Sequence, residues 1–150
     1  MPAAKFNPVF AENRRARHDY SVLETVECGI ALTGTEVKSV RHGEVSLAGE
    51  YGAVLGGELW LVGADIAAYK FGNRFNHEPK SMRKLLVHAK EVRELRLKTE
   101  AKGLTLVPLS VYLKRGRIKV SLGVCRGKAL HDKREALKKK ALRRDLERDG

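Results

Sequence analysis

Several segments of this 150-residue chain alternate apolar and polar residues with a period of two, and this pattern restricts the fold more than any other feature. Across residues 20–32 the even positions read Tyr, Val, Glu, Val, Cys, Ile and Leu, whereas most odd positions are polar or small. Successive side chains of a strand point to opposite faces, so a mainly apolar even face indicates a strand with one buried side. The first strand is predicted here.

Two further segments have the chemistry of β-hairpins. Gly56 and Gly57 stand between two apolar runs, and paired glycines supply the positive φ angles of a two-residue hairpin turn. Residues 104–124 predict a last hairpin with its turn around Arg115 and Gly116. Pro108 interrupts that segment, and because proline cannot donate a ladder hydrogen bond, we expect it at an edge or a bulge.

The remaining elements are shorter. Residues 83–88, RKLLVH, read as a strand that follows an exposed loop, and residues 35–43 read as a short helix or strand. Residues 88–103 predict a helix, since Val92 and Leu95 lie three apart among good helix formers and Gly103 is a suitable stop. A sheet of about six short hairpin-connected strands manages its edges best by closing. We therefore predict a mainly β fold, a closed antiparallel OB-like β-barrel of about six strands with flanking short helices and a basic C-terminal tail.

The chain is expected to hold one domain with appendages. Residues 1–12 are predicted to be a flexible N-terminus and residues 13–126 the barrel. Residues 127–150 form a tail with nine Lys or Arg and five Asp or Glu. Its leucines do not make a stripe wide enough to pack on the barrel, so we expect it to be disordered in the free protein and helical on a partner.

The charge indicates the class of partner. A formal net charge of +12 and a pI near 10.0 predict a polyanion. Nucleic acid is favoured over a membrane surface, because the apolar residues of the tail are mostly Ala and Leu without Trp or Phe. No apolar run approaches the roughly 18 residues of a membrane span, and the N-terminus lacks the apolar region of a secretory signal, so a cytoplasmic protein is expected.

Sequence patterns for catalysis or metal binding are missing. Cys28 and Cys125 have no CxxC or zinc spacing and are predicted to be free thiols. The segment GVCRGKA has three residues between its glycines where a P-loop has four, and Ala129 stands where a P-loop has Ser or Thr. The five histidines have neither metal spacing nor an evident nucleophile partner. We expect no cofactor, no metal and no catalytic site.

The last strand presents a basic face. Ile118 and Val120 point one way, whereas Arg117 and Lys119 point the other, and further basic residues follow at the strand ends. OB-type barrels bind nucleic acid on one face, although a merely solubilising outer face is the alternative. Aromatic residues are only 6% of the chain, so backbone charge and shape must dominate over base stacking. Folded RNA fits such a surface better than duplex DNA read by a recognition helix.

Glu27 is an acidic residue on the polar face of the first strand. It lies near Gly29, whose missing side chain would let another backbone approach closely. One interpretation is a solvated glutamate. The other is a carboxylate that accepts hydrogen bonds from a base edge or a 2′-hydroxyl within a basic field.

Read in order, the segments NRRARHDY, GIALTGTEVKSVR, GELWL, RKLLVH, GLTLVPLSVYLKRGRIKVSLGV and GKALHDKR resemble the SmpB family of SsrA-binding proteins. The resemblance covers about residues 13–134 and implies a closed OB-like barrel with flanking helices. It also implies an RNA-binding set, to which the basic last strand adds two residues: Arg15, Arg17, Glu27, Lys38, Arg83, Leu86, His88, Lys119 and Arg126. A ribosome-facing set is implied at the start of the tail: Gly127, Lys128, His131, Asp132, Lys133 and Arg134.

The function implied by the resemblance is trans-translation. Proteins of this family bind the tRNA-like domain of transfer-messenger RNA and bring it to stalled bacterial ribosomes, where the tail would occupy the decoding centre and the empty message channel. Transfer-messenger RNA and the ribosome are thus the expected partners, with one protein monomer per RNA. A general ribosome-associated RNA-binding factor or chaperone is the main alternative, and a small enzyme of RNA metabolism is a third. Ser81 and Ala129 stand where the family usually has Arg and Lys, and each departure removes one phosphate contact at most.

Overall fold

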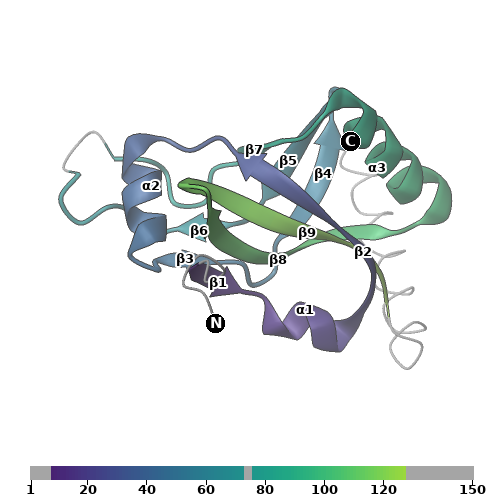
Figure 1. The fold of residues 1–150 in the computed structure, drawn as a ribbon, viewed down its shortest axis with the longest axis horizontal. Coiled ribbons are helices and arrows are strands. Elements are labelled where there is room, and N and C mark those ends of the chain that lie inside the picture. Colours follow the sequence, from purple (N-terminus) through teal and green to yellow (C-terminus); the bar gives the residue numbers. More distant parts are fainter. Residues whose placement is uncertain (1–7, 73–75, 128–150) are drawn as a thin grey trace, which may run out of the picture.

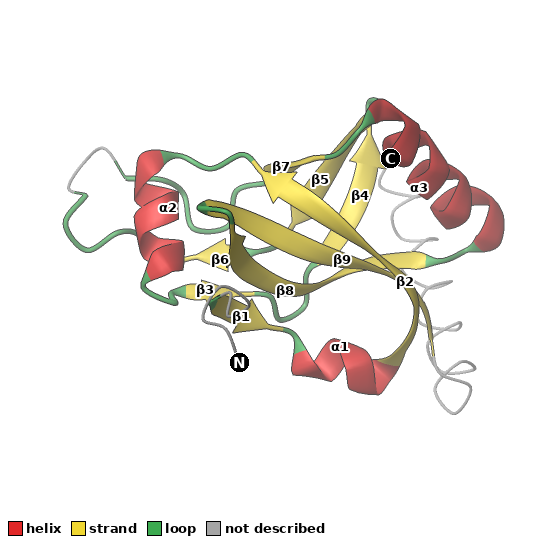
Figure 2. Cartoon of the chain, in the orientation of Figure 1, coloured by secondary structure: helices red, strands yellow, loops and turns green. Residues whose placement is uncertain are grey.

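A computed structural model describes residues 8–72 and 76–127, and this part of the chain holds three helices and nine strands (Figures 1 and 2). In chain order the elements are β1 (Val9–Glu12), α1 (Arg14–Asp19), β2 (Tyr20–Ile30), α2 (Gly34–Arg41), β3 (Val45–Ser46), β4 (Tyr51–Leu55), β5 (Glu58–Val62), β6 (Asp65–Ile66), β7 (Arg83–Leu86), α3 (Ala89–Lys102), β8 (Thr105–Lys114) and β9 (Arg117–Gly127).

Six strands form a closed antiparallel ring. The sheet runs in the order β1-β8-β4-β5-β7-β2-β9, and β9 also pairs with β8, which closes the circle from β8 back to β8. The edge strand β1 joins the ring on β8, and β3 and β6 form a separate two-stranded sheet. The predicted closed barrel of about six strands is confirmed, because every ring strand has a partner on both sides.

Both predicted hairpin turns are present. Gly56 and Gly57 have φ angles of 60° and 77°, and Arg115 and Gly116 have 53° and 74°. Positive φ at both central positions is the geometry of the two-residue turns that suit the twist of antiparallel strands. The pairing of β8 with β9 shifts register between Pro108 and Ser110, so of the two predicted possibilities for Pro108, an edge or a bulge, the structure has the bulge.

The structure differs from the sequence expectation at the N-terminus and in the short elements. Residues 1–12 were expected to be flexible, but Val9–Glu12 form β1 and pair with β8. Asn13 follows β1 and begins α1, since its side chain accepts a hydrogen bond from the Ala16 N–H and donates to the Pro108 carbonyl. Residues 35–43, left open between helix and strand, contain most of α2. The predicted helix before Gly103 is α3, and Gly103 ends it with a φ of 65°.

The core fills the inside of the ring. Its fully buried side chains come from five of the six ring strands: Cys28, Leu59, Leu61, Leu85, Leu106, Val120, Leu122 and Val124. Helix α3 adds Val92 and Leu95, the two residues from which the helix was predicted. The alternation in β9, with Ile118 and Val120 inside and Arg117 and Lys119 outside, is as expected. One buried face per strand therefore sets the register of the ring.

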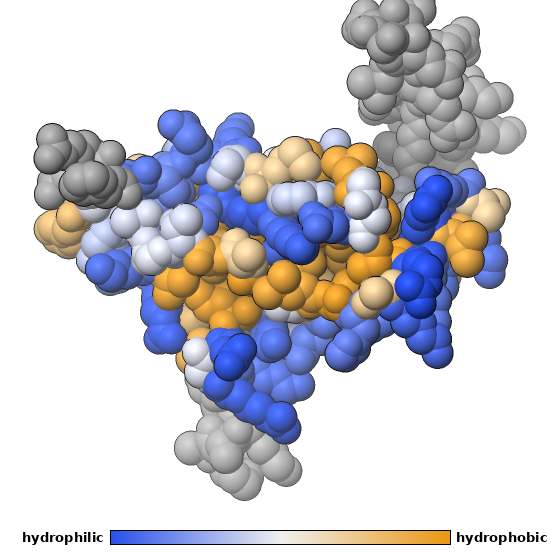
Figure 3. Space-filling view, turned by 90° about the horizontal axis from the view of Figure 1, so that it is seen from above, coloured by the Kyte–Doolittle hydropathy of each residue, from blue (hydrophilic) through white to orange (hydrophobic). Residues whose placement is uncertain are grey.

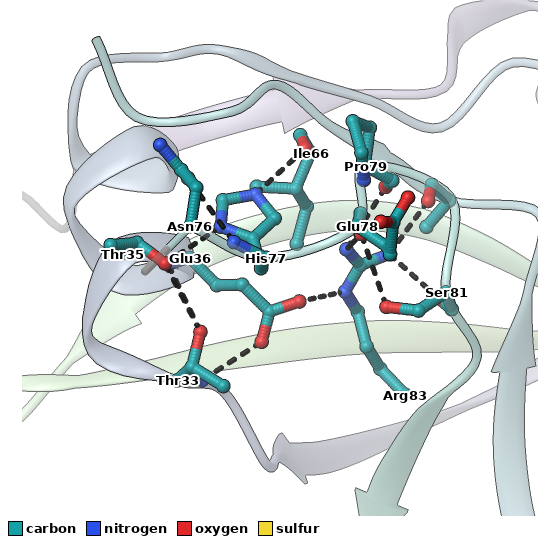
Figure 4. Close-up of polar contacts among 11 residues, drawn as sticks. Thr33, Thr35, Glu36, Ile66, Asn76, His77, Glu78, Pro79, Ser81 and Arg83 are labelled. Atoms are coloured by element: carbon teal, nitrogen blue, oxygen red, sulfur yellow. Dashed lines mark hydrogen bonds and ion pairs between the residues drawn. The ribbon is translucent and has the colours of Figure 1, made fainter. Parts of the chain in front are cut away.

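Helix α2 begins with a capping box. The Thr33 hydroxyl accepts a hydrogen bond from the Glu36 N–H, and Glu36 Oε1 accepts one from the Thr33 N–H at 2.8 Å. The other carboxylate oxygen, Glu36 Oε2, accepts a hydrogen bond at 2.5 Å from Nε of Arg83 at the start of β7. One carboxylate thus both starts α2 and attaches it to the barrel (Figure 4).

Arg83 uses its remaining donors on backbone carbonyls. Nη1 donates to Ala64 and Ser81, both at 2.8 Å, and Nη2 donates to Glu78 at 3.0 Å and Pro79 at 2.9 Å. The pair is buried, with 2% of the Arg83 side chain and 5% of the Glu36 side chain exposed. Burial disfavours the ionised Glu36, but the Thr33 N–H and Arg83 outweigh it and lower the pKa of the carboxyl. The pair therefore holds α2, β7 and the turn before β7 in one arrangement.

Arg83→Met is expected to lower the free energy of unfolding by about 3–5 kcal/mol, because it leaves the Glu36 carboxylate buried without its cation. Urea unfolding of the purified protein measures the change. Lys84→Met is the matched control on the same strand, since the Lys84–Glu58 pair is nearly half-exposed and should contribute less than about 1 kcal/mol. Equal losses in the two variants would contradict the role given to Arg83.

Candidate nucleic-acid interface

A groove of about 480 Å³ opens between α2 and the turn that joins β8 to β9. Its floor is apolar and its rim is cationic, and its lining residues are Gly29, Ile30, Leu32, Val37, Arg41, Leu86, Gly116, Arg117, Ile118 and Lys119. Three of these side chains are basic and none is acidic. Such a groove suits a polyanion that also presents an apolar surface. RNA is a ligand of this kind, because its phosphates are anionic and the faces of its bases are apolar.

Gly29 and Leu86 face each other on the neighbouring strands β2 and β7. A Cβ on Gly29 would lie 3.2 Å from the Leu86 Cβ, closer than side chains normally pack. The prediction was that another backbone approaches Gly29, but the atom that comes closest is the side-chain Cβ of Leu86 on the paired strand β7. Leu86 remains 49% exposed, so the glycine lets β7 present a leucine to the groove.

Glu27 stands beside the groove in a second hollow of about 320 Å³, which is otherwise lined by Lys114, Arg115, Arg117 and Lys119. The Tyr112 hydroxyl donates to Glu27 Oε2 at 2.5 Å, and Lys114 Nζ donates to the same oxygen at 3.1 Å. The hydrogen bond from Tyr112 and then the Lys114 ammonium hold the pKa of the Glu27 carboxyl below its ordinary value. Burial and the bond to Glu27 raise the pKa of Tyr112.

These contacts make Glu27 a fixed, ionised acceptor on the exposed side of the strand. Two ionised oxygens offer about four acceptor sites, so the carboxylate retains room for donors from a ligand. Among the described residues that line this hollow, Glu27 is the single acid among four cations. It is therefore neither a merely solvated glutamate nor free to rotate.

The structure brings together part of the predicted RNA-binding set. Leu86 and Lys119 line the groove, with Gly29 opposite both, and Glu27 lines the neighbouring hollow, which shares Lys119 with the groove. His88 lies two residues beyond Leu86, where it precedes α3 and is exposed. Lys38 is exposed on α2, one residue from Val37 of the groove wall.

A second part of the set lies at the other end of β2. Tyr20 pairs with Gly127 and Ser21 with Arg126, whereas Gly29 pairs with Lys119. Eight residues separate the two ends, which is roughly 25 Å along an extended strand. Arg15 and Arg17 are exposed on α1 beside this far end, and Arg15 pairs with Asp19 at 3.3 Å. Arg15, Arg17 and Arg126 therefore form a separate basic region.

Arg83 is the member of the set that the structure places elsewhere. Its guanidinium lies inside the protein and all its described hydrogen bonds go to Glu36 and backbone carbonyls. The expectation of a direct RNA contact is corrected on this physical ground, because an interior guanidinium has no donor left for a phosphate. Arg83 instead positions β7 and thereby Leu86.

Sequence reasoning missed two residues of this surface, Arg41 and Tyr112. It named Lys114 as a basic residue at a strand end but not as a partner of Glu27. The alternation along β8 puts Tyr112 and Lys114 on one face, which is a usable signal. Their contact with Glu27 depends on the register of three strands, with Tyr112 opposite Lys119 and Glu27 opposite Ser121. No local pattern specifies that register.

Of the predicted ribosome-facing set, Gly127 is the last residue of β9. Lys128, His131, Asp132, Lys133 and Arg134 lie outside the described residues.

The described residues hold no cluster of three or more His, Cys, Asp or Glu arranged to bind a metal ion. Cys28 and Cys125 are free and buried, as predicted, and burial raises the pKa of the Cys28 thiol to about 12. A thiol with such a pKa is not a nucleophile at neutral pH. None of the helices in the described part of the chain has the length and apolar content to span a membrane.

One face of the molecule carries a strip of apolar residues bordered by hydrophilic ones (Figure 3). Exposed large apolar side chains such as Leu23, Leu86 and Leu97 are distributed over the described surface. The described surface is therefore not uniformly polar.

Known proteins of the same kind match the chain along most of its length. The SsrA-binding protein of Staphylococcus haemolyticus is 54% identical over 138 residues, 92% of this chain and 88% of that one. The SsrA-binding protein of Staphylococcus saprophyticus is 50% identical over 149 residues, 99% of this chain and 97% of that one. The SsrA-binding protein of Trichormus variabilis is 54% identical over 141 residues, 93% of this chain and 91% of that one.

A solved structure described as "tmRNA-SmpB: a journey to the center of the bacterial ribosome" superposes with a TM-score of 0.67 at 55% identity, over 81% of this chain and 86% of that one. The sequence profile of the family described as "SmpB protein" matches residues 10–150. The closed ring, the basic groove and these matches agree, and the chain belongs to the SmpB protein family.

Proposed function

We propose that this protein binds the tRNA-like domain of transfer-messenger RNA and brings it to stalled ribosomes for trans-translation. The observation that carries the proposal is an apolar groove with a cationic rim. Beside this groove the fixed Glu27 carboxylate lies in a hollow that four cationic side chains line. A surface of cations alone would bind any RNA by its phosphates. An oriented acceptor adds a contact that depends on the donors a particular fold of RNA presents.

The family supports the choice of RNA. The relatives are SsrA-binding proteins, and the solved structure is described as transfer-messenger RNA with SmpB on the bacterial ribosome. Transfer-messenger RNA and the ribosome are accordingly the partners of this protein, and we place its work in the cytoplasm, where ribosomes translate. We propose one protein monomer per RNA and no catalytic role, with the RNA held by non-covalent contacts.

The geometry of β9 supports a division of labour along the chain. The groove lies at the start of β9, at the turn with β8, whereas Gly127 ends β9 next to Tyr20 and the helix α1. Gly127, the last described residue, thus lies at the end of the barrel far from the groove. We propose that transfer-messenger RNA occupies the groove end while Lys128, His131, Asp132, Lys133 and Arg134 face the decoding centre and the empty message channel.

The alternative of a general RNA-binding factor differs in selectivity. Such a factor uses the same basic surface but gains nothing from an oriented acceptor, so it binds folded RNAs about equally.

A competition between transfer-messenger RNA and bulk tRNA at fixed salt tests the proposal. We expect at least a tenfold preference for transfer-messenger RNA, together with a steep decrease in affinity as salt rises, because each neutralised phosphate contributes about 0.7 to 0.9 to the slope of log K against log salt. Equal binding of the two RNAs would favour the general factor. A slope near zero would exclude binding driven by charge.

Glu27→Gln is expected to weaken the binding of transfer-messenger RNA about tenfold, because a hydrogen bond to a charged group contributes roughly 1.5–3 kcal/mol. The direction of the change in affinity is informative. Removal of a negative charge from a protein of net charge +12 otherwise strengthens RNA binding. Glu24→Gln is the matched control, because Glu24 lies on the same strand and also pairs with a lysine, Lys98. If both variants bind RNA equally well or more tightly, Glu27 makes no specific contact.

The triple variant Asp132→Ala, Lys133→Ala, Arg134→Ala is expected to bind transfer-messenger RNA within a few-fold of the natural protein and to fail in tagging. Asp132 near the start of the tail and the two cations after it suit helix initiation against ribosomal RNA. Gel shift measures RNA binding, and a reconstituted translation system stalled on a truncated message measures tag addition. Proportional loss of both activities would place the tail in the RNA clamp, and normal tagging would deny it a role on the ribosome.

A further inference from the structure

Helix α2 has a third face that neither the core nor the groove uses. Its buried face carries Glu36, Ser39 and Val40, and its groove face carries Val37 and Arg41, which lie four residues apart. The next pair at the same spacing is Lys38 and His42, and both are exposed. This pair meets the segment after β6, which lies beside α2 at the end of the molecule opposite α3 (Figure 1).

Three rings gather on this face. The rings of His42 and Tyr69 stack with centroids 6.0 Å apart and planes 23° apart, and Phe71 meets Tyr69 edge to face at 5.6 Å. Lys38 Nζ lies 5.4 Å from the centroid of Tyr69, and Lys70 Nζ lies 6.0 Å from that of Phe71. We name these five residues, Lys38, His42, Tyr69, Lys70 and Phe71, the aromatic platform.

Hydrogen bonds to the backbone hold two residues of the platform, Tyr69 and His42, in place. Asn76 accepts a hydrogen bond from the Tyr69 N–H at 2.8 Å and donates to the Tyr69 carbonyl at 2.6 Å, so the backbone of Tyr69 is fixed on both sides. His42 donates from Nδ1 to the Lys38 carbonyl at 2.7 Å, which fixes the orientation of its ring. Tyr69 is half-buried by these neighbours, whereas Phe71 remains 72% exposed.

The exposed Phe71 ring has Lys70 over it, and a second lysine, Lys38, lies over the neighbouring ring of Tyr69. This arrangement has a definite chemical complement. Burial of its ring against an apolar partner alone would leave the ammonium groups of Lys38 and Lys70 without anions, whereas a nucleotide supplies a flat π-face and a phosphate together. The neighbouring face of α2 already borders the groove through Arg41, so one RNA chain can continue from the groove around the helix. Paired bases hide their faces in the stack, so the fitting partner is an unpaired one.

We propose that the aromatic platform is a second RNA subsite, in which Phe71 stacks on an unpaired nucleobase while Lys38 and Lys70 bind the adjoining phosphates. The subsite extends the interface from which the proposed function was argued, and it therefore rests on that function for the identity of the RNA. With this subsite, the affinity for RNA has a stacking contribution, which is insensitive to salt, apart from the charge contribution of the groove.

The test is a titration of transfer-messenger RNA and of bulk tRNA against variants of the full-length protein at several salt concentrations. Phe71→Ala is expected to weaken binding of transfer-messenger RNA by about 5-fold to 100-fold, the range for loss of one base–aromatic stack, with an unchanged salt slope. Phe71→Trp retains the stack and should restore the affinity. Lys38→Ala should instead reduce the salt slope by about 0.7 to 0.9.

Leu97→Ala is the matched control, because Leu97 is 64% exposed on α3 at the opposite end of the molecule. It should leave binding unchanged. A second measurement locates the contact: p-benzoylphenylalanine in place of Phe71 is photo-cross-linked to the RNA, and the adduct should map to an unpaired nucleotide. An adduct confined to base-paired RNA, or no adduct with the RNA bound, would overturn the subsite.

The outcomes also separate this subsite from the proposed function. Preference for transfer-messenger RNA by the natural protein with equal binding by Phe71→Ala would overturn the platform and leave the function standing. No preference between the RNAs, with weakening of both by Phe71→Ala, would overturn the function and support the platform. Absence of binding to either RNA would overturn both.

Discussion

The ion pair between Glu36 and Arg83 is the interaction on which the surface depends. Without it, α2 would keep the contacts of Val37 and Val40 with the core and the hydrogen bond from its first turn to His77. It would lose the ion pair that attaches the start of this eight-residue helix to β7. With it, the same helix presents Val37 and Arg41 to the groove in a fixed orientation. Arg83 also donates hydrogen bonds to the backbone carbonyls of the turn before β7, so the strand that carries Leu86 starts at a defined place. Burying an ion pair costs desolvation free energy. Here the pair fixes the positions of α2 and β7 in addition to any stability that it contributes.

The long strands β2 and β9 separate two basic regions. The ring closes with nine paired positions between them, and the pairing runs from Tyr20 and Gly127 to Gly29 and Lys119. Charge is therefore divided between two ends roughly 25 Å apart. A rigid spacer of this kind lets one small domain contact two anionic surfaces without the repulsion that a single cluster of the same cations would generate.

Local sequence patterns predicted much of the fold because its strands are simple. Period-two alternation and positive-φ turn residues at Gly56, Gly57 and Gly116 specify the hairpins, and closure follows from the need to pair edges. The patterns did not predict that Arg83 points inward, because a basic residue at a strand start next to Lys84 reads as surface charge. Its partner Glu36 is 47 residues away, and only the folded ring brings the two together.

The low aromatic content of the chain led to the expectation that charge dominates binding, and the folded structure qualifies that reasoning. At 6% of residues the rings are few, but what matters for stacking is their position rather than their number. Three rings separated by up to 29 positions in sequence meet on one helix face with two lysines. The overall amino-acid composition does not reveal such a local cluster. Under the proposed function, charge sets how strongly the protein is drawn to RNA, whereas the fixed carboxylate and the exposed ring select the RNA shape that remains bound.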